Sequence, residues 1–129
     1  MYEISEKQGY VRINFSGRIG LEEMKEWLNE MRSAMSQPDP SGLIMIDLRE
    51  MSVLPKEALA ILETAQRAGN KSGLKRSAVI VKSAIIQMQF ERIAKLTGIY
   101  TKERYISAET NPRWEKAAEA WILHGTEPA

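Results

Sequence analysis

The sequence predicts an α/β fold with a single mixed β-sheet and helices packed on it. Two apolar runs, LIMID at residues 43–47 and SAVIV at residues 77–81, show no polar alternation, which is typical of strands covered on both faces. A helical pattern follows each run, and an alternating hairpin precedes both. These observations favour the element order β-β-α-β-α-β-α-β-α.

The first part of the chain is predicted to form a hairpin and an amphipathic helix. YEIS at residues 2–5 and YVRINFSG at residues 10–17 flank EKQG, and the second segment alternates at the two-residue period of a half-buried strand. Beyond residue 20, apolar residues recur at three- and four-residue steps. They are Leu21, Met24, Leu28, Met31 and Met35. The prolines of QPDPSG, residues 37–42, then interrupt helical geometry.

The second part of the chain carries helix boundaries of recognisable chemistry. Pro55 suits the first turn of a second helix, where its missing amide is not needed. Ser83 is predicted to cap a third helix and Gly98 to end it. ERYIS at residues 103–107 predicts a last, more exposed strand, and ETNPRWEKAAEAWIL at residues 109–123 a final helix.

Length and composition indicate one globular domain of the ordinary soluble kind. The 129 residues are expected to form a core over residues 2–123 and a flexible tail at residues 124–129. A net charge of +1 gives no electrostatic support for binding nucleic acid. The absence of cysteine excludes disulfides and thiolate chemistry, and no apolar run approaches the roughly 20 residues of a membrane span. Without a signal peptide, the protein is expected in the cytoplasm.

Catalytic chemistry has little support in the sequence. No GxGxxG, Walker-type, HExxH or GxSxG motif occurs. His124 is the only histidine, and it has no second histidine or cysteine beside it, so it is expected at a solvated helix end. We therefore expect no enzyme activity, no cofactor and no metal; an enzyme would have to depend on Asp47 or His124.

The segment LIMIDLREMSVLPKEALAIL, residues 43–62, carries a resemblance to a known family. Together with the element order, it resembles the STAS-type fold of anti-sigma-factor antagonists and of the cytoplasmic tails of sulphate transporters. It is most similar to the SpoIIAA-like (STAS/SEC14-like) branch of small bacterial proteins. The resemblance covers Tyr2 to about Leu123 and implies a non-catalytic regulatory module that binds a protein partner.

The resemblance also implies a phosphorylation site that this chain has lost. In such antagonists an Asp-Leu pair closes the strand, and about seven residues later an Asp-Ser-Ser-Gly run supplies the phosphoacceptor serine. The pair is present at residues 47–48, but PKEA at residues 55–58 places Lys56 at the acceptor position. Ser52, earlier in the loop, and Glu57, as a permanent negative charge, are the alternatives.

Asp47 and the third helix leave several interpretations open. Asp47 either orders its own turn through backbone amides or shapes a ligand site at the carboxyl end of the sheet. AIIQMQFERIAKL, residues 84–96, is apolar over an arc of roughly 200°, about twice what packing on a sheet requires. Neighbouring helices could bury the surplus; otherwise it faces a protein partner, an apolar small molecule such as a fatty acid or lipid, or a second copy in a homodimer.

The expected partner or ligand surface combines the loop from Leu48 to Lys56 with the adjoining helix face. Its residues are Asp47, Met51, Ser52, Leu54, Lys56, Glu57, Ile61, Ile86 and Phe90. The first hypothesis is a regulatory protein-interaction module, and the alternative is a carrier or sensor of an apolar small molecule.

Overall fold

A single five-stranded sheet forms the centre of the protein, and the computed structural model describes residues 1–37 and 41–128. The strands lie in the order β1 (Tyr2–Lys7), β2 (Tyr10–Gly17), β3 (Leu43–Met51), β4 (Arg76–Val81) and β5 (Glu103–Ser107). β1 runs antiparallel to β2, whereas β2 to β5 are parallel to one another. The predicted single mixed sheet is confirmed.

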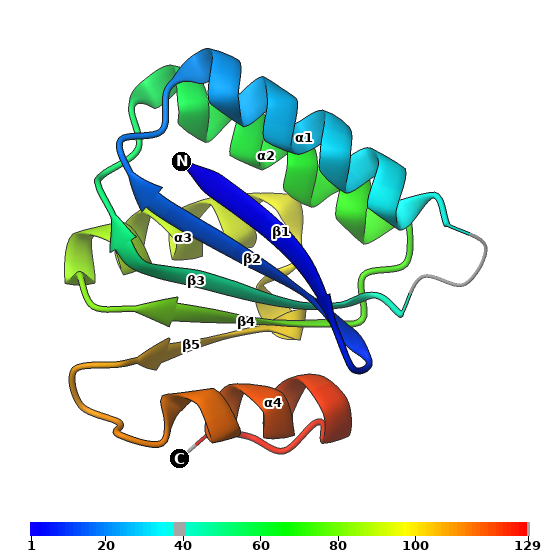
Figure 1. Ribbon diagram of the computed structural model, residues 1–129, viewed down its shortest axis with the longest axis vertical. Helices are drawn as coiled ribbons and strands as arrows, with labels where there is room; N and C mark the ends of the chain where they lie inside the picture. The colour runs from blue at the N-terminus through cyan, green and yellow to red at the C-terminus, as the bar shows by residue number, and fades with distance from the viewer. Residues whose placement is uncertain (38–40, 129) are drawn as a thin grey trace.

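Helices cover both faces of the sheet unequally. α1 (Leu21–Met35), α2 (Lys56–Lys71) and α3 (Ala84–Thr97) pack on one face, and α4 (Trp114–His124) packs alone on the other (Figure 1). The order of elements is as predicted, apart from one added 3-10 turn, η1 (Tyr100–Lys102), before β5.

Local chemistry explains several of the element boundaries. The hairpin between β1 and β2 closes through two residues, and Gly9 adopts the positive φ of 90° that such a tight turn requires. Ser83 Oγ accepts a hydrogen bond from Ile86 N at 3.3 Å, and Gly98 ends α3 at φ 87°, so both predicted caps are confirmed. α4 begins only at Trp114, because Asn111 Oδ1 binds Arg113 N at 2.9 Å and closes a turn first.

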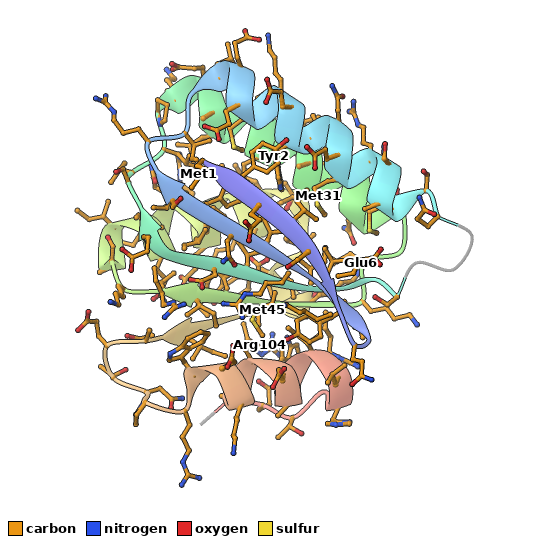
Figure 2. All side chains as sticks on the ribbon, viewed as in Figure 1. Met1, Tyr2, Glu6, Met31, Met45 and Arg104 are labelled. Atoms are coloured by element: carbon orange, nitrogen blue, oxygen red, sulfur yellow. The ribbon has the colours of Figure 1, made fainter. Side chains whose placement is uncertain are left out.

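Two hydrophobic cores lie on the two faces of the sheet. The larger core contains Phe90 of α3 and Trp27 of α1, which the predicted stripe of the first helix omitted. The smaller core packs Trp121 of α4 against Met45 and Ile80. Figure 2 shows Met45 between the sheet and α4, and Met31 on the side of α1 that faces the sheet. Neighbouring residues of β3 therefore face different cores.

The C-terminal segment makes specific contacts with β5. Glu127 pairs with Arg104, whose Nε and Nη2 donate at 2.6 and 2.8 Å, and Arg104 lies 4.0 Å from the Trp121 ring centroid. Gly125 N donates to Trp121 O at 2.8 Å. Residues 124–128, for which the sequence predicts a flexible tail, thus contact the domain up to Glu127. Ala129 and residues 38–40 of the predicted proline break lie outside the described residues.

Candidate functional site

The loop between β3 and α2 is fixed against α3 by one side chain. Gln89 Nε2 donates to Leu54 O at 3.1 Å, and Gln89 Oε1 accepts from Leu54 N at 3.2 Å. Both backbone polar groups of Leu54 are satisfied in this way, which orders a segment without regular structure. Loop and helix lie on the same side of the sheet, as the predicted contact surface requires.

Besides Asp47, which is 5% exposed, four of the nine predicted contact residues are buried and do not form a surface. They are Met51, Leu54, Ile86 and Phe90, with exposed fractions of 6, 3, 4 and 0%. All four belong to the larger core, because the loop and the inner face of α3 pack directly on the sheet. The prediction is therefore corrected for these four. Ser52, Lys56 and Glu57 are exposed, and Ile61 is half-buried.

The outer face of α3 carries three exposed apolar side chains, with the exposed Arg92 among them. Ile85, Met88 and Leu96 are 62, 68 and 58% exposed, and a rotation of 100° per residue places them within an arc of about 80°. Val53, next to the loop residue that Gln89 binds, is 52% exposed. We call Val53, Ile85, Met88 and Leu96 the outer stripe. Part of the predicted apolar surplus of this helix is thus exposed, while the inner half is core.

Asp47 lies on the opposite face of the sheet, toward α4. Its carboxylate accepts hydrogen bonds from Arg12 Nη2 at 2.9 Å and Arg49 Nη2 at 2.8 Å, and from the backbone N of Arg49 at 3.1 Å. Arg12 also binds Glu115 at 2.9 Å, and the Arg49 guanidinium lies 4.2 Å from the Trp114 ring centroid. The cluster joins the start of α4 to β2 and β3.

The electrostatics of Asp47 agree with a structural role. Burial alone would raise the pKa of Asp47, but hydrogen bonds from Arg49 and Arg12 hold that pKa below its ordinary value, so the side chain is a carboxylate. Arg49, whose backbone N binds Asp47, lies within β3, which continues to Met51, so this bond orders the strand end rather than the turn that the sequence predicted after Asp47. Because Asp47 points away from the outer stripe, it does not contribute to a contact surface there.

The position at which the resemblance places a phosphoacceptor is an exposed helix start. Lys56 opens α2 and Glu57 follows it, while Pro55 at the cap makes no side-chain hydrogen bond. Ser52 is exposed, and its backbone N donates to Gly17 O at 2.9 Å, which places it at the end of the strand pairing and before α2. Phosphorylation of Ser52 and charge mimicry by Glu57 stay predictions.

A cavity of about 160 Å³ lies at the other end of the sheet, beneath α1 and α2 and beside the amino ends of β3, β4 and β5. Apolar side chains form most of its wall, including Ile13, Trp27, Leu28, Met31, Ile44 and Leu62. The exposed residues Arg32, Ser36 and Ser72 mark its mouth, between the C-terminal ends of α1 and α2. The cavity was not predicted from the sequence, because its wall is formed by segments that lie far apart along the chain.

Buried polar side chains also line this cavity. Glu103 is 2% exposed, although its strand was predicted to be the more exposed one, and it accepts from Ser77 Oγ at 2.7 Å and Tyr105 OH at 2.5 Å. Burial raises the pKa of Glu103 to about 7, against these two hydrogen bonds, which lower it. Gln66 is 8% exposed, and Trp27 Nε1 is buried with no hydrogen-bond partner among the described residues.

Other kinds of site find no support in the described structure. Within residues 1–37 and 41–128, no group of three or more His, Cys, Asp or Glu side chains is placed to hold a metal ion. None of the helices in that part of the chain combines the length and the hydropathy of a membrane span. His124 is exposed at the last position of α4, as predicted.

Comparison with known proteins agrees with this architecture. A family model described as SpoIIAA-like matches residues 10–123, from β2 to the end of α4. The crystal structure of an uncharacterized DUF3478-family protein with a SpoIIAA-like fold, from Shewanella loihica PV-4, is similar with a TM-score of 0.60 and 19% identity, over 95% of this chain and 92% of that chain. No curated protein matches the sequence. The chain belongs to the SpoIIAA-like family.

Proposed function

We propose that the protein is a non-catalytic regulatory module that binds a protein partner through the outer stripe and the adjoining loop. The family and the fold support a STAS-type domain. The observation that carries the proposal is the exposure of Ile85 and Met88, 62 and 68%, beside a loop that Gln89 holds in place. Contiguous exposed apolar side chains of this kind commonly mark protein interfaces.

The charges around the outer stripe indicate what kind of partner would fit. Lys56, Lys82, Arg92 and Lys95 are exposed near the loop or along α3, against Glu57 and the half-buried Glu91. The same rotation of 100° per residue places Arg92 inside the outer stripe, between Met88 and Leu96, so basic groups lie within and around the apolar side chains. The fitting partner therefore presents an apolar patch with acidic neighbours. With Lys56 at the acceptor position, the proposed contact is not switched by phosphorylation at that residue.

Capture of partners from the native host tests this surface. Ile85→Asp and Met88→Asp place a charge in the middle of the stripe and are expected to reduce partner recovery at least about tenfold, the ratio that 1.4 kcal/mol of interface energy gives. Lys116→Asp, an exposed change on α4 across the sheet, serves as the control. If both stripe variants recovered every protein that the wild-type chain recovers, the surface assignment would be wrong.

Self-association is an alternative use of the same stripe. Analytical ultracentrifugation of the wild-type chain and of Met88→Asp separates the two cases. A dimer that Met88→Asp converts to a monomer would assign the stripe to a homodimer interface. A monomer in both samples supports a heterologous partner.

A second candidate function is carriage or sensing of an apolar small molecule, and the cavity beneath α1 and α2 favours it. From the sequence such a ligand was expected on the third helix, whereas the cavity is lined mainly by α1, α2 and the sheet. Native mass spectrometry of protein purified gently from a bacterial host tests this function. An added mass that organic solvent removes supports it; a chain that stays empty in every preparation contradicts it.

A further inference from the structure

Three of the polar side chains that line the cavity are themselves buried. Gln66, Ser77 and Glu103 are 8, 1 and 2% exposed. Gln66 Oε1 accepts from Thr97 Oγ1 at 2.8 Å, and its Nε2 has no partner in the described part of the chain. In the same wall, Trp27 Nε1 is fully buried without a partner among the described residues. An unsatisfied buried donor is destabilising, so the cavity is suited to a ligand that completes the hydrogen bonds.

The other two polar groups keep acceptor capacity. Each carboxylate oxygen of Glu103 receives one hydrogen bond, from Ser77 or from Tyr105, and a carboxylate oxygen can accept two. The Ser77 hydroxyl donates to Glu103 and retains its own lone pairs. Together with the Gln66 amide, this end of the cavity presents both a donor and acceptors inside an otherwise apolar wall.

We propose that the cavity binds an uncharged, mainly apolar molecule that directs a hydroxyl group, or a similar group able to donate and accept, toward Gln66 and Glu103. The proposal rests on the second candidate function and adds the chemical class of the ligand. The volume of about 160 Å³ is close to that of an apolar cavity known to hold benzene, about 150 Å³. The enclosed part of the ligand is thus the size of one small ring, and a longer chain would leave through the mouth.

Charge arguments separate this ligand class from a carboxylate. A carboxylate placed beside the buried Glu103 would bring two acids together, which disfavours ionisation of both. Arg32, the cation in the described lining, lies at the exposed mouth, so an anion would bind there with its apolar tail inward. That orientation would cover Gln66, Ser77 and Glu103 with hydrocarbon and leave the Gln66 amide without a partner.

Titration of the isotope-labelled full chain with toluene, phenol and benzoate tests the proposal by NMR. The three probes share one ring and differ in the polar group. Phenol is expected to bind at least about fivefold more tightly than toluene, the ratio that one net hydrogen bond supplies, and benzoate to bind more weakly than phenol. The side-chain amide signals of Gln66 and the indole signal of Trp27 report directly on the cavity.

Two variants locate the binding. Ala65→Leu narrows the cavity and is expected to weaken phenol and toluene alike, because Ala65 is part of the wall. Gln66→Met conserves the side-chain length but removes the amide, so it is expected to abolish the preference for phenol while toluene still binds. If Gln66→Met does not fold, the ranking of the three probes on the wild-type chain decides alone.

The results with the three probes test the proposed ligand class separately from the carrier function itself. Equal affinity for toluene and phenol, or tightest binding of benzoate, would overturn the hydroxyl assignment and leave an apolar ligand site in place. The absence of any shift at Trp27 and Gln66 with all three probes would overturn both the assignment and the second candidate function.

Discussion

The two ends of the parallel sheet differ in how completely their polar groups are satisfied. At the carboxyl ends, Asp47 is enclosed by two arginines, and both backbone groups of Leu54 bind Gln89. At the amino ends, the cavity beneath α1 and α2 leaves the Gln66 amide nitrogen and Trp27 Nε1 without partners among the described residues. At the carboxyl ends, the polar groups are satisfied within the protein, so only the outer surface is left for binding. At the amino ends, a cavity is left for binding.

This difference qualifies a general rule of α/β proteins. Open parallel sheets usually bind ligands at the carboxyl ends of their strands, and by that rule Asp47 is a candidate for shaping a ligand site. Here β3 continues to Met51, and Leu48 and Met51 of the strand pack into the core together with Leu54 of the short loop, which closes that end. Packing, rather than topology alone, decides where enclosed space is left.

The largest expected effect is a difference in stability between substitutions on the buried face and on the exposed face of α3. Phe90→Ala removes a fully buried ring and is expected to lower the free energy of unfolding by about 3–5 kcal/mol. Met88→Ala, two residues earlier but 68% exposed, is expected to change it by less than about 0.5 kcal/mol. Urea denaturation of both variants checks this. Similar losses for the two would mean that the outer stripe is not an outer face.

The next effect concerns the amino end and depends on pH. The folded pKa of Glu103 is about 7 and the ordinary value is 4.5. As the pH rises from 4.5 through 7, the unfolded chain releases this proton and the folded chain holds it, so stability present at low pH is lost, by about 3 kcal/mol at pH 8. Glu103→Gln carries no such charge. The wild-type free energy of unfolding, minus that of the variant, is expected to fall by that amount between pH 4.5 and 8.

Exposed Glu109→Gln provides the control for that experiment. Its difference from the wild-type chain is expected to stay nearly constant across the same pH range. A constant difference for Glu103→Gln as well would contradict the burial of an ionisable carboxyl at this end of the sheet.

A smaller effect on the free energy of unfolding is expected at the carboxyl ends of the strands, where Asp47 lies. Asp47→Asn leaves Arg12 and Arg49 without their shared anion and is expected to destabilise the fold by about 2 kcal/mol at pH 7, since the arginines are partly accessible to water. Because the pKa of Asp47 is lowered, this contribution is lost as the pH falls through that pKa. Glu63→Gln, which breaks the surface pair with Arg67, is the comparison, expected below about 1 kcal/mol. Equal losses of stability for Asp47→Asn and Glu63→Gln would contradict a structural role for Asp47.

The smallest effect is expected at Ser52. Its side chain is exposed and only its backbone N is bound, so Ser52→Ala is expected to change the free energy of unfolding by less than about 0.5 kcal/mol. Partner recovery should also match the wild-type chain. A phosphorylated fraction in the intact mass of protein from its native host, absent from Ser52→Ala, would instead make Ser52 a replacement acceptor.

The elements of this fold could be predicted because their signals are local. Strand alternation, the apolar run of β3 and the caps at Ser83 and Gly98 depend only on residues close in sequence, and the structure confirms them. The family resemblance rested on one such segment and on element order, and the match over residues 10–123 confirms it.

The site was harder to predict because it depends on faces and register. β3 begins with four consecutive apolar residues, so their sequence does not show that Met45 faces α4, on the side of Asp47, while Ile44 faces the other helices. Arg12 reaches Asp47 only through the pairing of β2 with β3. Burial of Glu103 likewise follows from tertiary packing, since the charged strand start alone indicates exposure.

Photo-crosslinking in the native host tests the proposed partner surface most directly. A photoreactive residue at position 88 lies in the outer stripe, and one at position 116 lies on α4 across the sheet. The proposal predicts a discrete protein adduct from position 88 that position 116 does not give. No adduct from position 88, or the same adducts from both positions, would contradict it.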